Sequence, residues 1–175
     1  MFNTALKKSY EDSFTIRPLV YKDVFNLRRM FKHMSAKTLR EFFLYTRKAP
    51  GISEIKGLYS KIAARGGGCV VLPAHGEDEI AAFAYYVSQW NESFAEPAVV
   101  VNEAYQNRGA GNRALRYLIG HASSRGVPCF KLLIDPYNVK AKRLVNACGL
   151  AYSYEISKGE EEITLPLGGV KSAYN

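Results

Sequence analysis

The sequence changes character near residue 66, and this change limits the folds open to the chain. Apolar residues recur at helical spacing in three segments before that point: residues 24–34, 35–43 and 52–64. Three short apolar segments with brief polar connections follow it: residues 69–73, 80–89 and 98–101. Successive strands with short connections predict an antiparallel meander. An earlier segment, Phe14–Pro18, also reads as a strand, ended by a proline that cannot donate to a ladder.

The last part of the chain alternates helices with strands. A helix that opens at Gly109 and Gly111 precedes an apolar strand, and a second helix follows Asn138. Three strands complete the predicted set: residues 130–134, 151–157 and 163–167. Glycines are predicted to end the third helix at 66–68, and acidic residues to form the last turn at 159–162. The sequence therefore predicts one α/β domain over residues 1–175, with a mixed sheet and helices on both faces.

Composition bounds the class of protein. The chain has 175 residues, of which 47% are hydrophobic and 23% charged, as in ordinary globular proteins. No apolar run approaches the about 20 residues that a membrane-spanning helix needs, and residues 1–10 lack the apolar core of a signal peptide. Cys69, Cys129 and Cys148 are far apart and odd in number, which favours buried thiols in a reducing compartment. A cytoplasmic protein without membrane association is expected.

Basic charge is concentrated in the N-terminal third. Residues 1–65 hold 14 Lys and Arg against 5 Asp and Glu, a net charge of +9, whereas residues 66–175 hold 10 against 11, a net charge of −1. Such an excess favours acidic partners, namely an anionic cofactor, an acidic protein surface or nucleic acid. A solvated basic face is the simpler explanation, because net charge informs association rather than fold. Nucleic acid is therefore not the expected partner.

Residues 99–111 carry the most informative pattern, a strand followed by a turn, a glycine loop and a helix start. Loop amides and the partial positive charge of a helix N-terminus suit an anion, and Gly109 and Gly111 permit its close approach. Gln106 and Arg108 flank the loop, so a pyrophosphate is the natural ligand. The third glycine of a dinucleotide fingerprint and the Gly-Lys-Ser/Thr of a kinase-type loop are both missing. Taken alone, Gly-Ala-Gly also fits a plain tight turn.

A family resemblance extends this interpretation. The segment Gln106-Asn-Arg-Gly-Ala-Gly111 resembles the Gln/Arg-x-x-Gly-x-Gly/Ala signature of the GNAT superfamily of acyl-CoA-dependent N-acetyltransferases. Residues 138–150 are similar to that family's Asn-x-x-Ala/Met-x-x-Leu segment, and residues 16–23 resemble its first strand and helix. Residues 35–43 look like the branch that includes bacterial protein-lysine acetyltransferases. The resemblance, which spans residues 14–157, implies a GNAT-like, mostly antiparallel sheet of six to seven strands.

The resemblance also implies acetyl-CoA as the acyl-donor co-substrate. Loop amides around Gly109 would hold its pyrophosphate, the strand Val99–Val101 would pair with the pantetheine arm, and Asn138 would contact that arm from the other side. The implied cofactor-binding residues are Val99, Val101, Gln106, Arg108, Gly109, Ala110, Gly111, Asn112 and Asn138. Further candidates for a nucleotide phosphate lie on the next helix, with a solvated helix face as the alternative: Lys140, Lys142 and Arg143.

Direct attack by an amine needs one group that removes a proton from the ammonium and another that protonates the departing thiolate. Glu96, near where some family members place a glutamate base, is the candidate base, with a solvent-facing carboxylate as the alternative. Glu103 is a second candidate. The family's usual acid is a tyrosine at the position that Val145 occupies here. The acid is therefore sought among nearby tyrosines, with Tyr152 taken first: Tyr152, Tyr137 and Tyr154.

The sequence thus predicts an enzyme that moves an acetyl group from acetyl-CoA to a primary amine in a ternary complex. The acceptor stays open between a small molecule and a protein lysine, and a homodimer stays open as well. No metal site is expected, because the three histidines lack ligand spacing. Two alternatives are a non-catalytic acyl-CoA-binding module and a nucleic-acid-binding domain. The N-terminal helices and the aromatic strand at residues 80–90 are expected to set acceptor preference.

Overall fold

The computed structural model describes residues 13–76, 78–89, 93–157 and 159–168. Seven strands form one sheet in the order β1-β2-β3-β4-β5-β7-β6. They are β1 (Phe14–Pro18), β2 (Gly66–Pro73), β3 (Ala82–Ser88), β4 (Ala95–Val101), β5 (Cys129–Ile134), β6 (Ser153–Ser157) and β7 (Glu160–Pro166). The β4–β5 pair is parallel and the other neighbours are antiparallel. The predicted mixed, mostly antiparallel sheet is confirmed.

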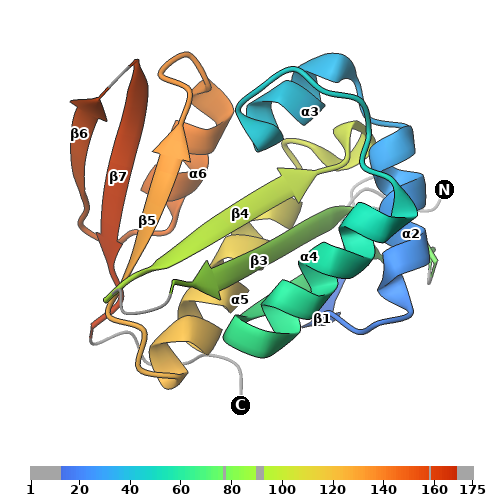
Figure 1. Ribbon diagram of the computed structural model, residues 1–175, viewed down its shortest axis with the longest axis horizontal. Coiled ribbons are helices and arrows are strands. Elements are labelled where there is room, and N and C mark those ends of the chain that lie inside the picture. The colour runs from blue at the N-terminus through green and yellow to red at the C-terminus, as the bar shows by residue number, and fades with distance from the viewer. Residues whose placement is uncertain (1–12, 77, 90–92, 158, 169–175) are drawn as a thin grey trace, which may run out of the picture.

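Helices cover both faces of this sheet (Figure 1). They are α2 (Asp23–Lys32), α3 (Ala36–Phe43), α4 (Ile52–Arg65), α5 (Ala110–Ser124) and α6 (Val139–Ala147), with a 3-10 turn η1 (Glu103–Tyr105). On one face, α5 buries Ala114, Leu115 and Leu118 against the sheet. On the other, α2 and α4 bury residues such as Leu27 and Ile55. Alternation along each strand supplies both clusters, because successive side chains point to opposite faces.

The N-terminal elements are fixed by short polar contacts. Asp23, the first residue of α2, is fully buried and receives two hydrogen bonds of 2.7 Å from the Arg17 guanidinium of β1. This two-bond geometry is the strong form of a carboxylate–arginine pair. The Ser35 hydroxyl caps α3 by accepting a hydrogen bond of 3.2 Å from the Thr38 amide, as predicted. These contacts anchor the chain that leads toward the centre of the molecule.

The sheet splits at its centre. The parallel strands β4 and β5 pair at Ala95 and Phe130, and Figure 1 shows them diverging from that end toward α3 and α6. Because strands that separate leave main-chain groups without a ladder partner, an opening of this kind exposes hydrogen-bonding backbone. The later part of β4, Val99–Val101, borders the opening.

The glycines at 66–68 end α4 as predicted, with Gly66 as its C-cap, but they also begin β2, three residues before the predicted strand at 69–73. Only glycine fits at position 66, where a Cβ would lie 1.8 Å from the Tyr86 carbonyl oxygen. One turn expectation is wrong. The acidic residues at 160–162 belong to β7 rather than to a turn. Pairing with β5 extends that strand, and Glu161 is buried beside Lys142, at 2.5 Å.

Strand limits also shift. β4 begins at Ala95, three residues before the predicted start, and β3 is shorter than the predicted strand at 80–89. Expectations that concern residues 1–10, Trp90 and part of the turn at 91–93 lie outside the described residues. Within the described part of the chain, no helix is both long and apolar enough to cross a membrane.

Candidate active site

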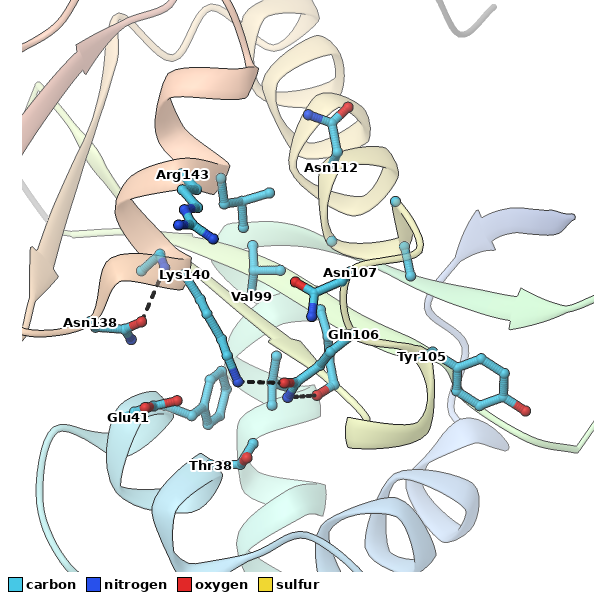
Figure 2. Close-up of a pocket in the computed structure, with 18 residues that line it drawn as sticks. Thr38, Glu41, Val99, Tyr105, Gln106, Asn107, Asn112, Asn138, Lys140 and Arg143 are labelled. Carbon is cyan, nitrogen blue, oxygen red and sulfur yellow. Dashed lines mark hydrogen bonds between the residues drawn. The ribbon is translucent and has the colours of Figure 1, made fainter. Parts of the chain in front are cut away.

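A cavity of about 270 Å³ lies where β4 and β5 diverge. Its walls come from α3, the end of β4, the loop that follows, the start of α5 and the start of α6, as Figure 2 shows. All of the predicted cofactor residues except Arg108 line it: Val99, Val101, Gln106, Gly109, Ala110, Gly111, Asn112 and Asn138. Arg108 lies instead beside the ring of Tyr105, with its Cζ 6.0 Å from the ring centroid. Segments distant in the sequence thus share one opening.

The glycine loop turns sharply into α5. Gly109 has a φ of 88°, in the left-handed region that favours glycine, and Asn107 has a φ of 60°. The helix begins at the next residue, Ala110, which is fully buried. The first backbone amides of a helix have no partner within it, so they can hold an anion at the cavity wall. The pyrophosphate site at this loop stays a prediction.

Side chains tie α5 to α6. The Asn112 amide nitrogen donates to the Ala147 carbonyl at 3.3 Å, and Arg116 donates to that same carbonyl at 3.0 Å. Arg116 also donates to the Asn112 side-chain oxygen at 2.9 Å. The Asn112 side chain is thus engaged by these contacts. Its main-chain amide lies in the first turn of α5 and is the group that Asn112 can offer a ligand.

Lys140 reaches from α6 to the glycine loop (Figure 2). Its ammonium donates to the Gln106 side-chain oxygen at 2.6 Å, and the Gln106 nitrogen donates to the Val101 carbonyl at 3.2 Å. On the same helix, the Asn138 side chain accepts from the Ala141 amide at 3.0 Å and caps α6. Lys140 is therefore the cation that spans the two sides of the opening.

The other two predicted phosphate candidates lie differently. Arg143 lines the cavity. Lys142 faces away to pair with the buried Glu161 of β7. Helical spacing agrees with this difference, because Arg143 lies three residues after Lys140 and shares its face, whereas adjacent residues such as Lys142 and Arg143 differ in direction by about 100°.

One wall of the cavity consists of α3, one of the N-terminal helices that the sequence analysis expects to set acceptor preference. Thr38, Glu41 and Phe42 line the opening from that side, and the Glu41 side chain is 24% exposed, 3.9 Å from the Lys37 ammonium. The amphipathic pattern of α3 predicted a helix but gave no indication of what its ends would face. Glu41 is thus a carboxylate in the site that the sequence reasoning missed.

Glu103 holds α3 in place. Its carboxylate accepts hydrogen bonds from the Ser35 amide at 2.9 Å and the Thr38 hydroxyl at 2.6 Å. Partial burial acts to raise the pKa of Glu103, but these hydrogen bonds outweigh it and lower the pKa below its ordinary value. The carboxylate predicted as a second base therefore serves as a clamp between η1 and the N-terminus of α3.

A second cavity of about 110 Å³ continues from the first along β4. The two share six wall residues: Glu41, Phe42, Val99, Asn138, Ala141 and Leu144. The remainder of the second wall is apolar: Pro97, Ala98, Leu115, Leu132, Leu133, Ile134 and Val145. Val145 lines this cavity and is 2% exposed. The position at which the family usually has tyrosine therefore faces this space.

The two predicted catalytic residues lie outside the walls of both cavities. Glu96 is the residue before the wall residue Pro97, and it accepts a hydrogen bond from the Gln89 amide at 3.1 Å. The pKa of Tyr85 is raised by burial and further by the charge of Glu96, which places the two near each other. Tyr152 donates its hydroxyl hydrogen to the Asn146 side chain at 2.7 Å. Their catalytic roles remain predictions.

Comparison with known families agrees with this architecture. The sequence model described as the Acetyltransferase (GNAT) family matches residues 33–150. This segment contains α3, the glycine loop and α6, which form the walls of the larger cavity. The chain therefore belongs to the GNAT acetyltransferase family. No curated protein matches the sequence.

Solved structures share the fold. The GNAT domain of PAT from S. lividans superimposes with a TM-score of 0.75 at 18% identity, over 86% of this chain and 89% of that one. A phosphinothricin acetyltransferase from Sinorhizobium meliloti, in complex with acetyl-CoA, gives 0.72 at 18% identity over 93% and 92%. The ribosomal-protein-S18-alanine N-acetyltransferase of Escherichia coli gives 0.61 at 19% over 93% and 99%. At these identities the likeness is one of fold.

Proposed function

We propose that this protein is an N-acetyltransferase that moves an acetyl group from acetyl-CoA to a primary amine by direct attack in a ternary complex. The observation that carries the proposal is the cavity between the diverging strands β4 and β5, which a helix N-terminus borders on one side and α3 on another. Family membership and the acetyl-CoA complex of a structural neighbour support the same cofactor.

The cavity suits two parts of CoA, its pyrophosphate and its pantetheine arm. The amides at the start of α5 and the cations Lys140 and Arg143 face one part of it, where a pyrophosphate gains from both. The pantetheine arm carries amides that can pair with the main chain of Val99, on the strand edge that β5 leaves open. The Val101 carbonyl already accepts from Gln106, so Val99 is the better partner for the arm.

Transfer needs no covalent enzyme intermediate. The neutral amine nitrogen attacks the thioester carbon and a C–N bond forms. The C–S bond then breaks, and the CoA sulfur leaves with its electron pair. The nitrogen gives up a second proton and the sulfur takes one, so the products are the amide and free CoA. A base must first remove a proton from the ammonium. Glu96 is our proposed base, acting directly or through water. It shares a face of β4 with Val100, the face that α3 and α4 cover, because side chains alternate along a strand.

The acid step is less demanding. A thiol has an ordinary pKa of about 8.5, so the CoA thiolate is a tolerable leaving group near neutrality. Among the described residues that line the second cavity there is no tyrosine, and Val145 lies where one is usual in the family. We propose that water or Tyr152 protonates the sulfur at modest gain.

The acceptor enters from the α3 side in this proposal, where Thr38, Glu41 and Phe42 form the wall. A carboxylate at that wall suits a cationic amine before its deprotonation. The direct test is an acetyl-CoA assay over a library of amines and peptides with mass spectrometry of the products, alongside calorimetry of CoA binding. Transfer to a defined amine is expected. Tight CoA binding with no transfer to any amine would instead indicate a non-catalytic module.

The base assignment has its own test on the acceptor so found. Glu96→Gln should lower kcat/KM at neutral pH by about a hundred- to ten-thousandfold, with partial recovery at high pH where the free amine is abundant. Glu41→Gln is the matched change and should act mainly on the KM for the acceptor. Tyr152→Phe should cost much less than Glu96→Gln. Full activity in Glu96→Gln together with a large loss in Glu41→Gln would move the base to α3.

A further inference from the structure

The second cavity lies where the reacting end of the cofactor must arrive. Along β4, Val101 faces the larger cavity, Val99 borders both cavities, and Pro97 borders the smaller one. A pantetheine arm that starts at the glycine loop and follows β4 therefore runs toward the smaller cavity. Its thioester would reach the shared wall first, and the acyl group attached to it would continue beyond.

The volume of this second cavity is larger than an acetyl group requires. Its volume is about 110 Å³, which corresponds to roughly three to four atoms of water size, because a water molecule occupies about 30 Å³ of the liquid. An acetyl group has a single methyl beyond its carbonyl. Val145, Leu115 and Ile134, which form the deep wall, are each almost fully buried.

The lining selects for chemistry as well as for size. Its walls are aliphatic and aromatic apart from Glu41 and Asn138, and among the described residues that line it none is cationic. The Asn138 side-chain oxygen already accepts from the Ala141 amide. A carboxylate at the end of an acyl chain would thus lose its hydration without a cationic partner and would meet the Glu41 carboxylate, which is strongly unfavourable.

From this geometry we propose that the second cavity is an acyl-chain pocket, and that the enzyme accepts uncharged straight-chain acyl groups longer than acetyl, with butyryl the best fit. The inference rests on the proposed use of a CoA thioester as donor. The transfer chemistry is unchanged: the amine nitrogen gains the acyl carbon and loses a proton, and the CoA sulfur takes the electron pair of the broken C–S bond and a proton.

Binding measurements test the pocket without an acceptor. Calorimetry of the full chain with CoA, acetyl-, propionyl-, butyryl-, octanoyl- and succinyl-CoA should show affinity rising about fourfold with each methylene from acetyl to butyryl. Octanoyl-CoA should bind less tightly than butyryl-CoA because its chain exceeds the volume. Succinyl-CoA should bind no more tightly than acetyl-CoA.

Substitutions at Val145 should move this optimum in opposite directions. Val145→Phe fills the deep end and should remove the advantage of butyryl over acetyl. Val145→Ala deepens the pocket and should move the best chain to a longer acyl group. Val139→Phe makes the same change on an exposed position of the same helix and should leave the ranking as in the parent. Thermal unfolding reports whether each variant folds, and Val145→Ala carries the test if Val145→Phe does not.

The outcomes separate the pocket from the proposed function. If CoA binds but affinity is flat from acetyl to butyryl, or if butyryl binds less tightly than acetyl, the acyl pocket is wrong and the proposed function stands. If a ranking by chain length exists but both Val145 variants leave it unchanged, the pocket lies elsewhere and this assignment is wrong. If no CoA species binds, both proposals fail.

Discussion

Gly109 and Gly111 occupy the same loop for different physical reasons. Gly109 adopts a φ of 88°, and a Cβ there would meet no atom within 4 Å, so its constraint lies in the backbone. Gly111 lies in the first turn of α5, and a Cβ there would lie 3.1 Å from Val101 Cγ2 and 3.6 Å from Leu144 Cδ1. Its constraint is the space between β4 and α6, which is the cavity itself.

A methyl group at position 111 should therefore damage the cofactor site without a change of backbone conformation. Gly111→Ala is expected to weaken CoA binding about tenfold, because overpacking of this kind costs typically 1–3 kcal/mol. Calorimetry measures the affinity, and circular dichroism checks the fold. Gly57→Ala, in α4 where a Cβ would meet nothing within 4 Å, is the matched control. Equal affinities in the two variants would show that the cavity accommodates a Cβ at position 111 without loss of CoA binding, which would contradict this prediction.

At the level of elements, α3 depends on a contact remote in sequence. It has eight residues, too few for an isolated helix to be stable in water. Glu103 secures its N-terminus through Ser35 and Thr38, and ring contacts from Phe42 and Phe43 to Phe31 secure the rest. The segment that leads to the glycine loop and the α3 wall of the cavity are thus coupled by one carboxylate.

Loss of that carboxylate should loosen the acceptor side. Glu103→Ala is expected to raise the KM for the acceptor several-fold and to change the KM for acetyl-CoA less, as steady-state kinetics would show. The pKa of Glu103 is lowered in the folded protein, so its contribution to stability is present above its unfolded pKa and is lost as pH falls through the folded value. The Glu103→Ala variant should therefore lose less stability than the parent protein as pH falls below about 4.5. Glu155→Ala, on the exposed edge strand β6, is the control, and equal KM values in both variants would contradict the clamp.

At the scale of the whole molecule, a titratable histidine of α5 contacts a tyrosine of β3. The Tyr86 hydroxyl lies 3.0 Å from His121 Nδ1, and Tyr117 stacks on the His121 ring. Burial lowers the pKa of His121, and the charge of Arg125 lowers it further. Gly67 leaves room for this contact, since a Cβ there would lie 2.5 Å from the His121 ring.

Stability should consequently fall on the acid side of neutrality. The lowered pKa means that the unfolded chain binds a proton that the folded chain excludes, so stability is full above the unfolded value near 6.5 and declines as pH falls toward the folded one. His121→Gln removes the titration and should flatten the melting temperature between about pH 5 and pH 7. The same change at the exposed His33 is the control and should keep the decline. A decline that persists unchanged in His121→Gln would assign it to other groups.

The sequence by itself determined the class of most elements and the position of the glycine loop. Helical spacing, the Ser35 cap and the glycines at 109 and 111 act within a few residues. The local structure that they determine can therefore be predicted from the sequence. That residues 1–175 form one domain stays a prediction of the same kind. The sequence also singled out Glu96 and Val145, but it did not predict which residues would surround them.

Tertiary structure decided what faces what. The divergence of β4 from β5 joins residues near positions 40, 100 and 140 into one opening, and no local pattern encodes such an encounter. It brought in Glu41, turned Lys142 toward Glu161 and made Glu103 a clamp rather than a free carboxylate. It also placed the glycines at 66–68 in a strand that pairs with β3. This pairing is possible because Gly66 has no Cβ, for which there would be no space. The physical reason is that packing and strand pairing act through space, between residues whose separation in the chain carries no signal of contact.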